Sequence, residues 1–242
     1  MKNRQRIRKA IVIIAFLLFP IIIFYFSPYL IMLGAWEGII TASFIMFSLL
    51  FFVSLFFGRS PCGYLCPIGG LQECLMLANN KKAKGGMLNR IKYFIWVPWI
   101  AAIVFFFIRS GGVNDVDFFF NIANGVSLYE PYTYVIYYGV LLIIVTLALT
   151  AGKRAFCHYI CWMAPFMVIG TKFADFLKIP KLHLKSNKER CISCKKCSEK
   201  CPMSLDVNEM VRNEKMKNTE CILCGECIDA CPKKAIGYSF KK

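Results

Sequence analysis

Two stretches decide the architecture of this chain: CISCKKCSEKCP at residues 191–202 and CILCGECIDACP at residues 221–232. Each has three cysteines separated by two residues, a fourth cysteine after three more residues, and then a proline. Every cysteine of the second stretch lies 30 residues after its counterpart in the first. Eight of the 13 cysteines therefore belong to one pattern written twice, which predicts a pair of metal sites.

This spacing is typical of bacterial two-cluster ferredoxins, in which the fourth cysteine of each stretch ligates the other cluster. Three cysteines on one tight loop reach one side of a cubane [4Fe–4S] cluster, and the fourth ligand must approach from another direction. The spacing rule therefore predicts two crosswise ligand sets, Cys191, Cys194, Cys197 and Cys231 for the first cluster and Cys221, Cys224, Cys227 and Cys201 for the second. Disulfides are disfavoured where thiols stay reduced, and structural zinc sites use two separated cysteine pairs.

The composition indicates a membrane domain joined to a smaller soluble one. The chain has 242 residues, of which 57% are hydrophobic, and the apolar residues are concentrated before about residue 180. We expect an all-α, four-helix transmembrane domain at residues 1–178 and a small α+β two-cluster ferredoxin domain at residues 179–242. The net charge of +16 does not indicate nucleic-acid binding, because the basic residues flank apolar spans, where they orient membrane helices.

Four apolar stretches are long enough, or nearly so, to cross a bilayer. They cover residues 10–26, 38–57, 91–108 and 133–151. Basic residues are frequent before the first stretch and between the second and third, whereas the other two loops hold only Arg109. The positive-inside rule then places both termini and the ferredoxin domain in the cytoplasm. A cleaved signal peptide is the alternative for residues 1–26, but no small-residue cleavage site follows the apolar run.

A second duplication follows the second and fourth apolar stretches. GRSPCGYLCP at residues 58–67 matches KRAFCHYICW at residues 153–162, with an offset of 95 residues. Each copy has a Cys-x3-Cys pair and an arginine three residues before the first cysteine. The membrane domain is therefore predicted to be two helical hairpins, each ending in such a pair and followed by a surface helix.

The two Cys-x3-Cys pairs would form one four-thiolate site if the pseudo-symmetry brings them together. These cysteines are Cys62, Cys66, Cys157 and Cys161. Such a site could hold a third iron–sulfur cluster or a soft metal such as Cu(I), or act as redox dithiols. Four inert buried cysteines are the alternative. Arg59 and Arg154 would offset the negative charge of the thiolates.

With these motifs, the chain resembles the membrane-bound polyferredoxins that carry a Cys-x3-Cys-Pro membrane motif. That family includes ferredoxin subunits of quinol dehydrogenases for periplasmic nitrate reductase, membrane regulators of nitrous-oxide reductase, and cytochrome-oxidase accessory proteins. The resemblance rests on Cys62, Cys66 and Pro67, on the eight ferredoxin cysteines, and on CPMSLDV at residues 201–207. Trp162 stands where the family usually has a second proline, so the two halves are not fully equivalent.

The resemblance implies an electron carrier or oxidoreductase subunit in the cytoplasmic membrane rather than a stand-alone enzyme. We expect it to connect a soluble cytoplasmic partner with a quinone or an outer-face redox protein. Copper reduction and handling for a respiratory enzyme is the main alternative, and a redox sensor is another. No residue is assigned a catalytic role.

Overall fold

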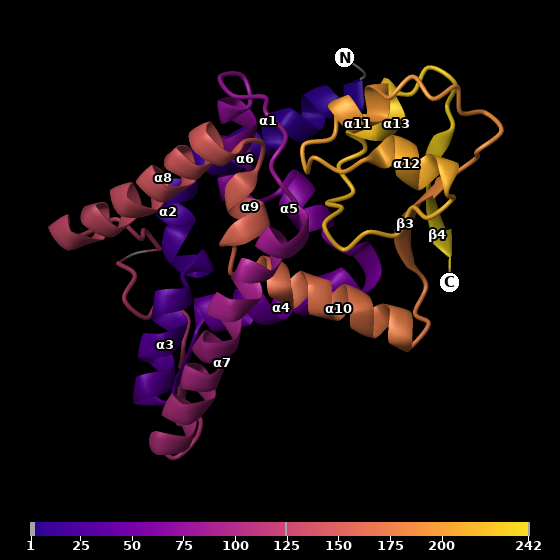
Figure 1. The fold of residues 1–242 in the computed structure, drawn as a ribbon. Coiled ribbons are helices and arrows are strands. Elements are labelled where there is room, and N and C mark those ends of the chain that lie inside the picture. Colours follow the sequence, from indigo (N-terminus) through magenta and orange to yellow (C-terminus); the bar gives the residue numbers. More distant parts are fainter. Residues whose placement is uncertain (1–2, 124, 242) are drawn as a thin grey trace.

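The computed structural model describes residues 3–123 and 125–241, and most of them are helical (Figure 1). The first half contains α1 (Asn3–Leu17), α2 (Phe19–Ile22), a 3-10 turn η1 (Ile23–Phe26), α3 (Pro28–Glu37), β1 (Ile39–Thr41), α4 (Ala42–Phe57), α5 (Ser60–Tyr64) and α6 (Pro67–Leu75). It continues with η2 (Gly86–Arg90), α7 (Ile91–Arg109), β2 (Asp115–Asp117), α8 (Pro131–Ala151), α9 (Ala155–Tyr159) and α10 (Ala164–Phe176). The last part holds β3 (Lys181–Ser186), α11 (Lys196–Glu199), α12 (Val207–Arg212), α13 (Glu226–Ala230) and β4 (Ile236–Lys241).

Two helices are long and apolar enough to span a membrane. One runs over Gly86–Arg109 and the other is α8. Their large apolar side chains face outward, including Phe94 at 78% and Val135 at 73% exposure. Such a surface is costly in water and favourable in lipid or against a partner. Both helices coincide with the third and fourth predicted spans.

The first two predicted spans have a different form. The first is divided into Asn3–Leu17 and Phe19–Phe26, which meet at an angle of 59°. Pro20 explains the break, because its ring excludes a regular helix hydrogen bond to the preceding turn. The second predicted span is the 16-residue helix α4, shorter than a typical spanning helix. In Figure 1, α7 and α8 point away from the centre in different directions, and α4 runs along α10.

An additional helix, α3, lies between the first two apolar stretches, where the sequence interpretation placed a turn. Ser27 caps its start by accepting a hydrogen bond from the Leu30 N–H at 3.4 Å, and Pro28 occupies the first turn. Gly38 ends it with φ of 75°, a left-handed conformation that favours glycine. The short strands β1 and β2 then pair in parallel, Ile39 opposite Asp115.

The helices that follow the two Cys-x3-Cys motifs pack in a related manner. Helix α6 packs on α1, and α10 packs on α4. Glycines allow both close approaches, since a Cβ on Gly70 would lie 2.0 Å from the Val12 carbonyl oxygen and one on Gly170 2.8 Å from the Phe51 carbonyl oxygen. Helices therefore occur where the sequence predicts a surface helix after each motif, and each packs against an earlier helix, α1 or α4.

The C-terminal region is built on an antiparallel pair of strands. Strand β3 pairs with β4 from Lys181 opposite Lys241 to Ser186 opposite Ile236. Along the chain, the segment between β3 and β4 holds the two cysteine stretches and the short helices α11, α12 and α13. Figure 1 shows this region beside α1 and α5. Its core includes Met203, Val207, Val211 and Ile222, each at most 3% exposed.

Candidate metal centres

Each of the two cysteine stretches folds into loops with the same unusual backbone. Non-glycine residues adopt positive φ at Ser193, Lys195 and Ser204 in the first stretch and its continuation. Positive φ recurs 30 residues later at Leu223, Gly225 and Lys234. Non-glycine residues rarely adopt this conformation because their Cβ meets the following carbonyl group. The sequence duplication therefore extends to a strained loop conformation, which is characteristic of functional sites.

One cavity is lined by the first predicted ligand set. Cys191, Cys194, Cys197 and Cys231 all face it, together with Ile192, Asn208, Val211 and Ile236. The sulfur of Cys231 accepts a hydrogen bond from the Ala235 backbone N–H at 3.3 Å. Burial raises the pKa of the Cys197 thiol, whereas hydrogen bonds from Ser198 lower it. Four thiols and neighbouring donors thus surround one space.

A second cavity is lined by the other predicted ligand set. Cys201, Cys221, Cys224 and Cys227 face it, together with apolar residues that include Met203, Met210 and Ile222. Burial raises the pKa of the Cys224 thiol to about 12, and the Glu226 backbone N–H acts in the opposite direction. These thiols would be protonated at neutral pH without a metal, so binding of iron would have to displace their protons.

The structure buries most cysteines of the two Cys-x3-Cys motifs and places the first motif against the second ferredoxin stretch. Cys62, Cys157 and Cys161 are at most 5% exposed, and Cys66 is partly buried at the start of α6. A Cβ on Gly63, between the first two of these cysteines, would lie 2.6 Å from the Ile222 carbonyl oxygen. The first Cys-x3-Cys motif is therefore in direct contact with the loop of the second ferredoxin stretch.

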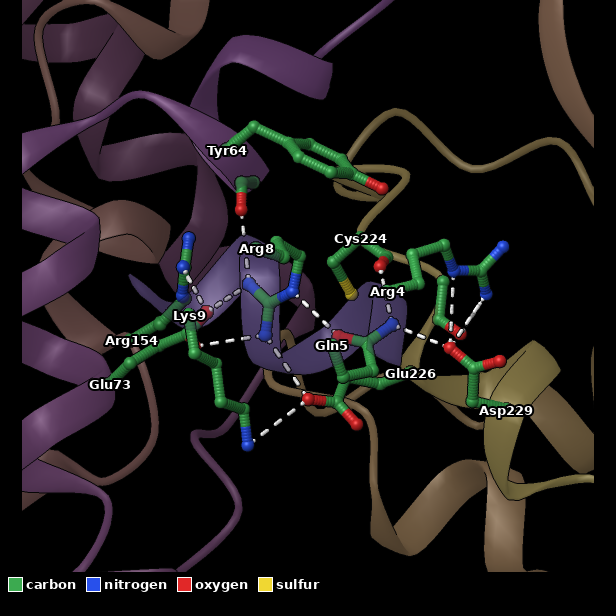
Figure 2. A network of polar contacts seen from close by, with 12 residues as sticks. Arg4, Gln5, Arg8, Lys9, Tyr64, Glu73, Arg154, Cys224, Glu226 and Asp229 are labelled. Carbon is green, nitrogen blue, oxygen red and sulfur yellow. Dashed lines mark hydrogen bonds and ion pairs between the residues drawn. The ribbon is translucent and has the colours of Figure 1, made fainter. Parts of the chain in front are cut away.

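A buried polar network holds α1, α6 and α13 together (Figure 2). Arg8, 1% exposed, donates to Glu73 at 2.6 and 2.9 Å, to Glu226 at 3.1 Å, and to the Gly63 carbonyl oxygen at 3.0 Å. Arg154 from the second membrane motif donates to the same Glu73 at 2.6 Å. Burial alone would raise the pKa of Glu73, but the two guanidinium groups outweigh this effect and hold that pKa below its ordinary value.

The N-terminal part of α1 reaches the second ferredoxin stretch directly. Gln5 donates to the Cys224 carbonyl oxygen at 3.1 Å and to Asp229 at 2.8 Å. Arg4 also donates to Asp229 at 2.8 Å, and Lys9 lies 3.3 Å from Glu226. In Figure 2 these side chains extend from α1 toward α13.

A second buried ion cluster joins Arg59, Lys92 and Glu220. Glu220 lies directly before Cys221 and accepts from Arg59 at 2.8 Å and from Lys92 at 2.6 Å. The side chains of Arg59 and Lys92 are 2% and 0% exposed. This cluster fixes the start of the second ferredoxin stretch to α7 and to the loop before α5.

Sequence reasoning missed most of these polar residues. It assigned Arg4, Arg8 and Lys9 to the charge that orients the first span, and it gave no role to Glu73 or Glu220. Their partners are distant in sequence, as with Arg8 and Glu226, which are 218 residues apart. A glutamate in an otherwise mostly apolar segment, as at position 73, was the available signal.

Two domain families match this chain. A 4Fe-4S dicluster domain matches residues 182–236, and a 4Fe-4S binding domain matches residues 39–84 and 132–180. The second match includes both Cys-x3-Cys motifs in full, since residues 58–67 fall within its first segment and residues 153–162 within its second. Together with the cysteine-lined cavities, the matches support [4Fe–4S] clusters as the cofactors.

Curated relatives are distant. A putative electron transport protein, YccM of Escherichia coli, is 23% identical over 66% of this chain and 46% of its own length. Two uncharacterized proteins of Methanocaldococcus jannaschii, MJ0750 and MJ0749, are 28% and 26% identical, over 65% and 64% of this chain and 64% and 55% of their own lengths. The chain thus spans about half to two thirds of the relatives it matches. No solved structure gives a significant match.

These findings support an iron–sulfur electron carrier. Residues 182–236 match a dicluster domain, and YccM is named a putative electron transport protein. The fold is mostly helical, with two helices apolar enough to span a membrane.

Proposed function

We propose that this chain is a membrane-bound iron–sulfur protein that transfers electrons between a soluble cytoplasmic partner and a quinone or outer-face redox protein. The observation that carries the proposal is the lining of the two cavities, because each contains three cysteines of one stretch and the distal cysteine of the other. Cys191, Cys194, Cys197 and Cys231 would hold one [4Fe–4S] cluster, and Cys221, Cys224, Cys227 and Cys201 the other. When bound, such clusters supply one-electron oxidation and reduction.

The chain's own residues give the two sites different surroundings. At the first site Cys194 is exposed, whereas at the second Cys224 and Cys227 are each 7% exposed. The second site also contacts the membrane cysteine motif through Gly63. The first site would therefore face the soluble partner and the second would face the membrane domain.

Membrane insertion is supported by the apolar helices and by the basic residues. The helices Gly86–Arg109 and α8 expose apolar side chains along their length. We propose that the broken first stretch and α4 complete a four-helix membrane domain. The short helix α4 would be extended by neighbouring residues or accommodated by local thinning of the bilayer. The distribution of lysine and arginine would keep both ends of the chain and the ferredoxin region in the cytoplasm.

A basic face surrounds the first site and suits an acidic electron carrier. We define this basic face by the exposed side chains Lys188, Arg190, Lys195, Lys196, Lys233 and Lys234. Glu189 is the acidic residue among these segments, so the face is strongly positive. Ile192, 58% exposed, offers an apolar contact at the cavity rim. Charge complementarity of this kind mainly accelerates encounter with a partner of opposite charge.

The proposal is tested on the full chain purified without oxygen and placed in lipid vesicles. Dithionite should bleach the visible absorption and produce the paramagnetic signal of two neighbouring reduced clusters, and a soluble quinone analogue should restore the colour. Cys194→Ser and Cys224→Ser should each lose about four irons. Cys74→Ser changes a cysteine outside both sets and serves as the control. A colourless protein, or full iron content in both ligand variants, contradicts the proposal.

The basic face has its own test. The double variant Lys195→Glu/Lys233→Glu should slow reduction by a small acidic ferredoxin by about tenfold or more at low salt, with the difference disappearing at high salt. The double variant Lys172→Glu/Lys215→Glu makes the same charge change on exposed residues outside the basic face. Equal rates for both variants at low salt would show that the partner docks elsewhere.

A further inference from the structure

Three consecutive backbone carbonyl oxygens in the second cysteine stretch each accept a hydrogen bond from a side chain outside that stretch. The donor and acceptor residues are Tyr238 and Leu223 at 2.6 Å, Gln5 and Cys224 at 3.1 Å, and Arg4 and Gly225 at 3.1 Å. Two of the donors belong to α1 (Figure 2) and one belongs to β4. Residues 223–225 are therefore held in place by two other segments of the chain.

These bonds also fix the direction of the backbone N–H groups. The described peptide bonds are all trans, and in a trans peptide the carbonyl group and the N–H of the next residue point in opposite directions. A carbonyl group that points toward α1 or β4 therefore turns the next N–H away from these elements. Cys224 and Gly225 line the second cysteine cavity, so the N–H groups are turned toward the side of the cysteine sulfurs.

One of these N–H groups illustrates the arrangement in full. Burial raises the pKa of the Cys224 thiol to about 12, and a hydrogen bond from the Glu226 backbone N–H acts against this rise. That N–H belongs to the same peptide group as the Gly225 carbonyl, which accepts the hydrogen bond from Arg4. A single peptide group is thus bonded to α1 through its oxygen and to a cysteine sulfur through its N–H.

The first cysteine stretch lacks this arrangement. Its corresponding residues 193–195 are exposed, and within the described part of the chain their carbonyl oxygens accept no side-chain hydrogen bond. Lys195 stands where the second stretch has Gly225. A Cβ on Gly225 would lie 2.5 Å from the Tyr238 hydroxyl oxygen and 2.6 Å from Arg4 Nη2, so glycine is needed for these donors to approach. The two copies of the cysteine pattern therefore differ at the position where the outside donors bind.

We infer that Arg4, Gln5 and Tyr238 are positioning residues that raise the reduction potential of the cluster in the second cysteine cavity. The inference rests on the proposed function, in which that cavity holds a [4Fe–4S] cluster. Reduction adds one electron to the cluster, and N–H groups held toward the cysteine sulfurs stabilise the more negative, reduced form. Two of the three donors lie on α1, so the first helix of the chain adjusts a site that is formed near the end of the chain.

The test is a redox titration of the full chain in lipid vesicles, followed by electron paramagnetic resonance. The signal that Cys224→Ser loses identifies the second cluster, and the signal that Cys194→Ser loses identifies the first. Tyr238→Phe removes one hydroxyl group and no charge, and it should lower the midpoint potential of the second cluster only. At a fixed ambient potential, the ratio of reduced to oxidised second cluster should fall by about three- to tenfold, and tenfold corresponds to about 59 mV for a one-electron couple.

Tyr64→Phe is the matched control, and Gln5→Met is a second test variant. The Tyr64 hydroxyl lies 3.4 Å from that of Tyr238, and among the described residues it bonds to no carbonyl oxygen of residues 223–225, so Tyr64→Phe should keep the wild-type midpoint potentials. Gln5→Met removes the buried donor to Cys224 without changing the net charge, and it should lower the midpoint potential of the second cluster. Iron is counted in each variant, because full iron content shows that a shift does not come from a lost ligand.

The outcomes separate this inference from the proposed function. Unchanged midpoint potentials in both Tyr238→Phe and Gln5→Met, at full iron content, would overturn the inference and leave the proposed function intact. An equal shift in Tyr64→Phe, or an equal shift of the first cluster, would also overturn it, because the effect would not depend on the carbonyl groups of residues 223–225. Loss of iron from the second site in both test variants would overturn it in favour of a purely structural role. A wild-type protein without iron–sulfur signals would contradict the proposed function itself.

Discussion

Replacing Arg8 by methionine should loosen the ferredoxin region from helices α1 and α6. Arg8 is 1% exposed and donates to Gln5 at 2.7 Å, in addition to its bonds with Glu73, Glu226 and Gly63. Methionine preserves the apolar stem and removes every donor. Glu73, 8% exposed, would keep only Arg154 as a partner, and the Gly63 carbonyl would lose its donor.

The size of the effect follows from these contacts. Removing one partner of a buried ion pair costs about 3–5 kcal/mol, because the other charge stays buried without compensation. Arg154 and Lys9 still neutralise the two glutamates in part, so we take the lower end, about 3 kcal/mol. At about 1.4 kcal/mol per tenfold change, this corresponds to about a hundredfold larger population of undocked protein.

Hydrogen exchange followed by mass spectrometry measures that population. Backbone amides in residues 221–230 should lose protection by about a hundredfold in Arg8→Met, while those inside α7 should not change. Arg6→Met is the matched control, because Arg6 lies on the same helix and is exposed. Equal protection of residues 221–230 in the two variants would refute the view that Arg8 holds the ferredoxin region in place.

Three further changes probe the same contacts. Gly63→Ala should lower the free energy of unfolding by about 1–3 kcal/mol, because the new Cβ would lie 2.6 Å from the Ile222 carbonyl oxygen. Gly139→Ala is the control, since its Cβ would meet nothing within 4 Å and the change should be neutral or stabilising; equal urea midpoints for the two variants would contradict the close approach. Glu220→Gln should cost about 3 kcal/mol by stranding a buried guanidinium and ammonium group, and a urea midpoint within error of wild type would argue against this. Folding lowers the pKa of Glu73, so its carboxylate stabilises the folded protein above about pH 4.5, and this stabilisation is lost as the pH falls through the pKa of the folded state. The difference in unfolding free energy between wild type and Glu73→Gln should therefore shrink toward acid pH. A difference that stays constant with pH would exclude this linkage.

In the ferredoxin region, the cysteine spacing was enough to predict which cysteines group together. The crosswise rule groups Cys231 with the first stretch and Cys201 with the second, and the cavities are lined by these same groups. A tight loop with fixed spacing leaves few conformations, so local sequence is sufficient here. The roles of these cysteines as ligands remain predictions until iron is counted.

The membrane region was predicted less completely. Apolar length identified α7 and α8, and Pro20 inside the first stretch predicts a kink where the structure bends by 59°, but neither showed that a separate helix starts at Pro28. Hydropathy shows how favourable a segment is in lipid, but it gives little information about where its helices begin, end or bend. Turn and capping residues at Ser27, Pro28 and Gly38 held that information, and they were interpreted only as a loop.

The polar connections could not be predicted because each joins segments far apart in sequence. Arg154 and Glu73 are 81 residues apart, and Arg59 and Glu220 are 161 apart. A basic residue near an apolar span has the same sequence context whether it orients a helix in the membrane or forms a buried ion pair. Only the packing of these distant segments in the fold distinguishes the two cases.

The hydrogen bonds and ion pairs between α1 and α13 also form in a fixed order during biosynthesis. Arg4 and Asp229 are 225 positions apart, so at about 5–20 residues per second the ribosome needs about 11–45 s to make the second after the first. Throughout that interval α1 is without its partners on α13. The second cysteine stretch consequently emerges before its contacts with α1 have formed, so its loop stays accessible from the side that Gln5 later contacts.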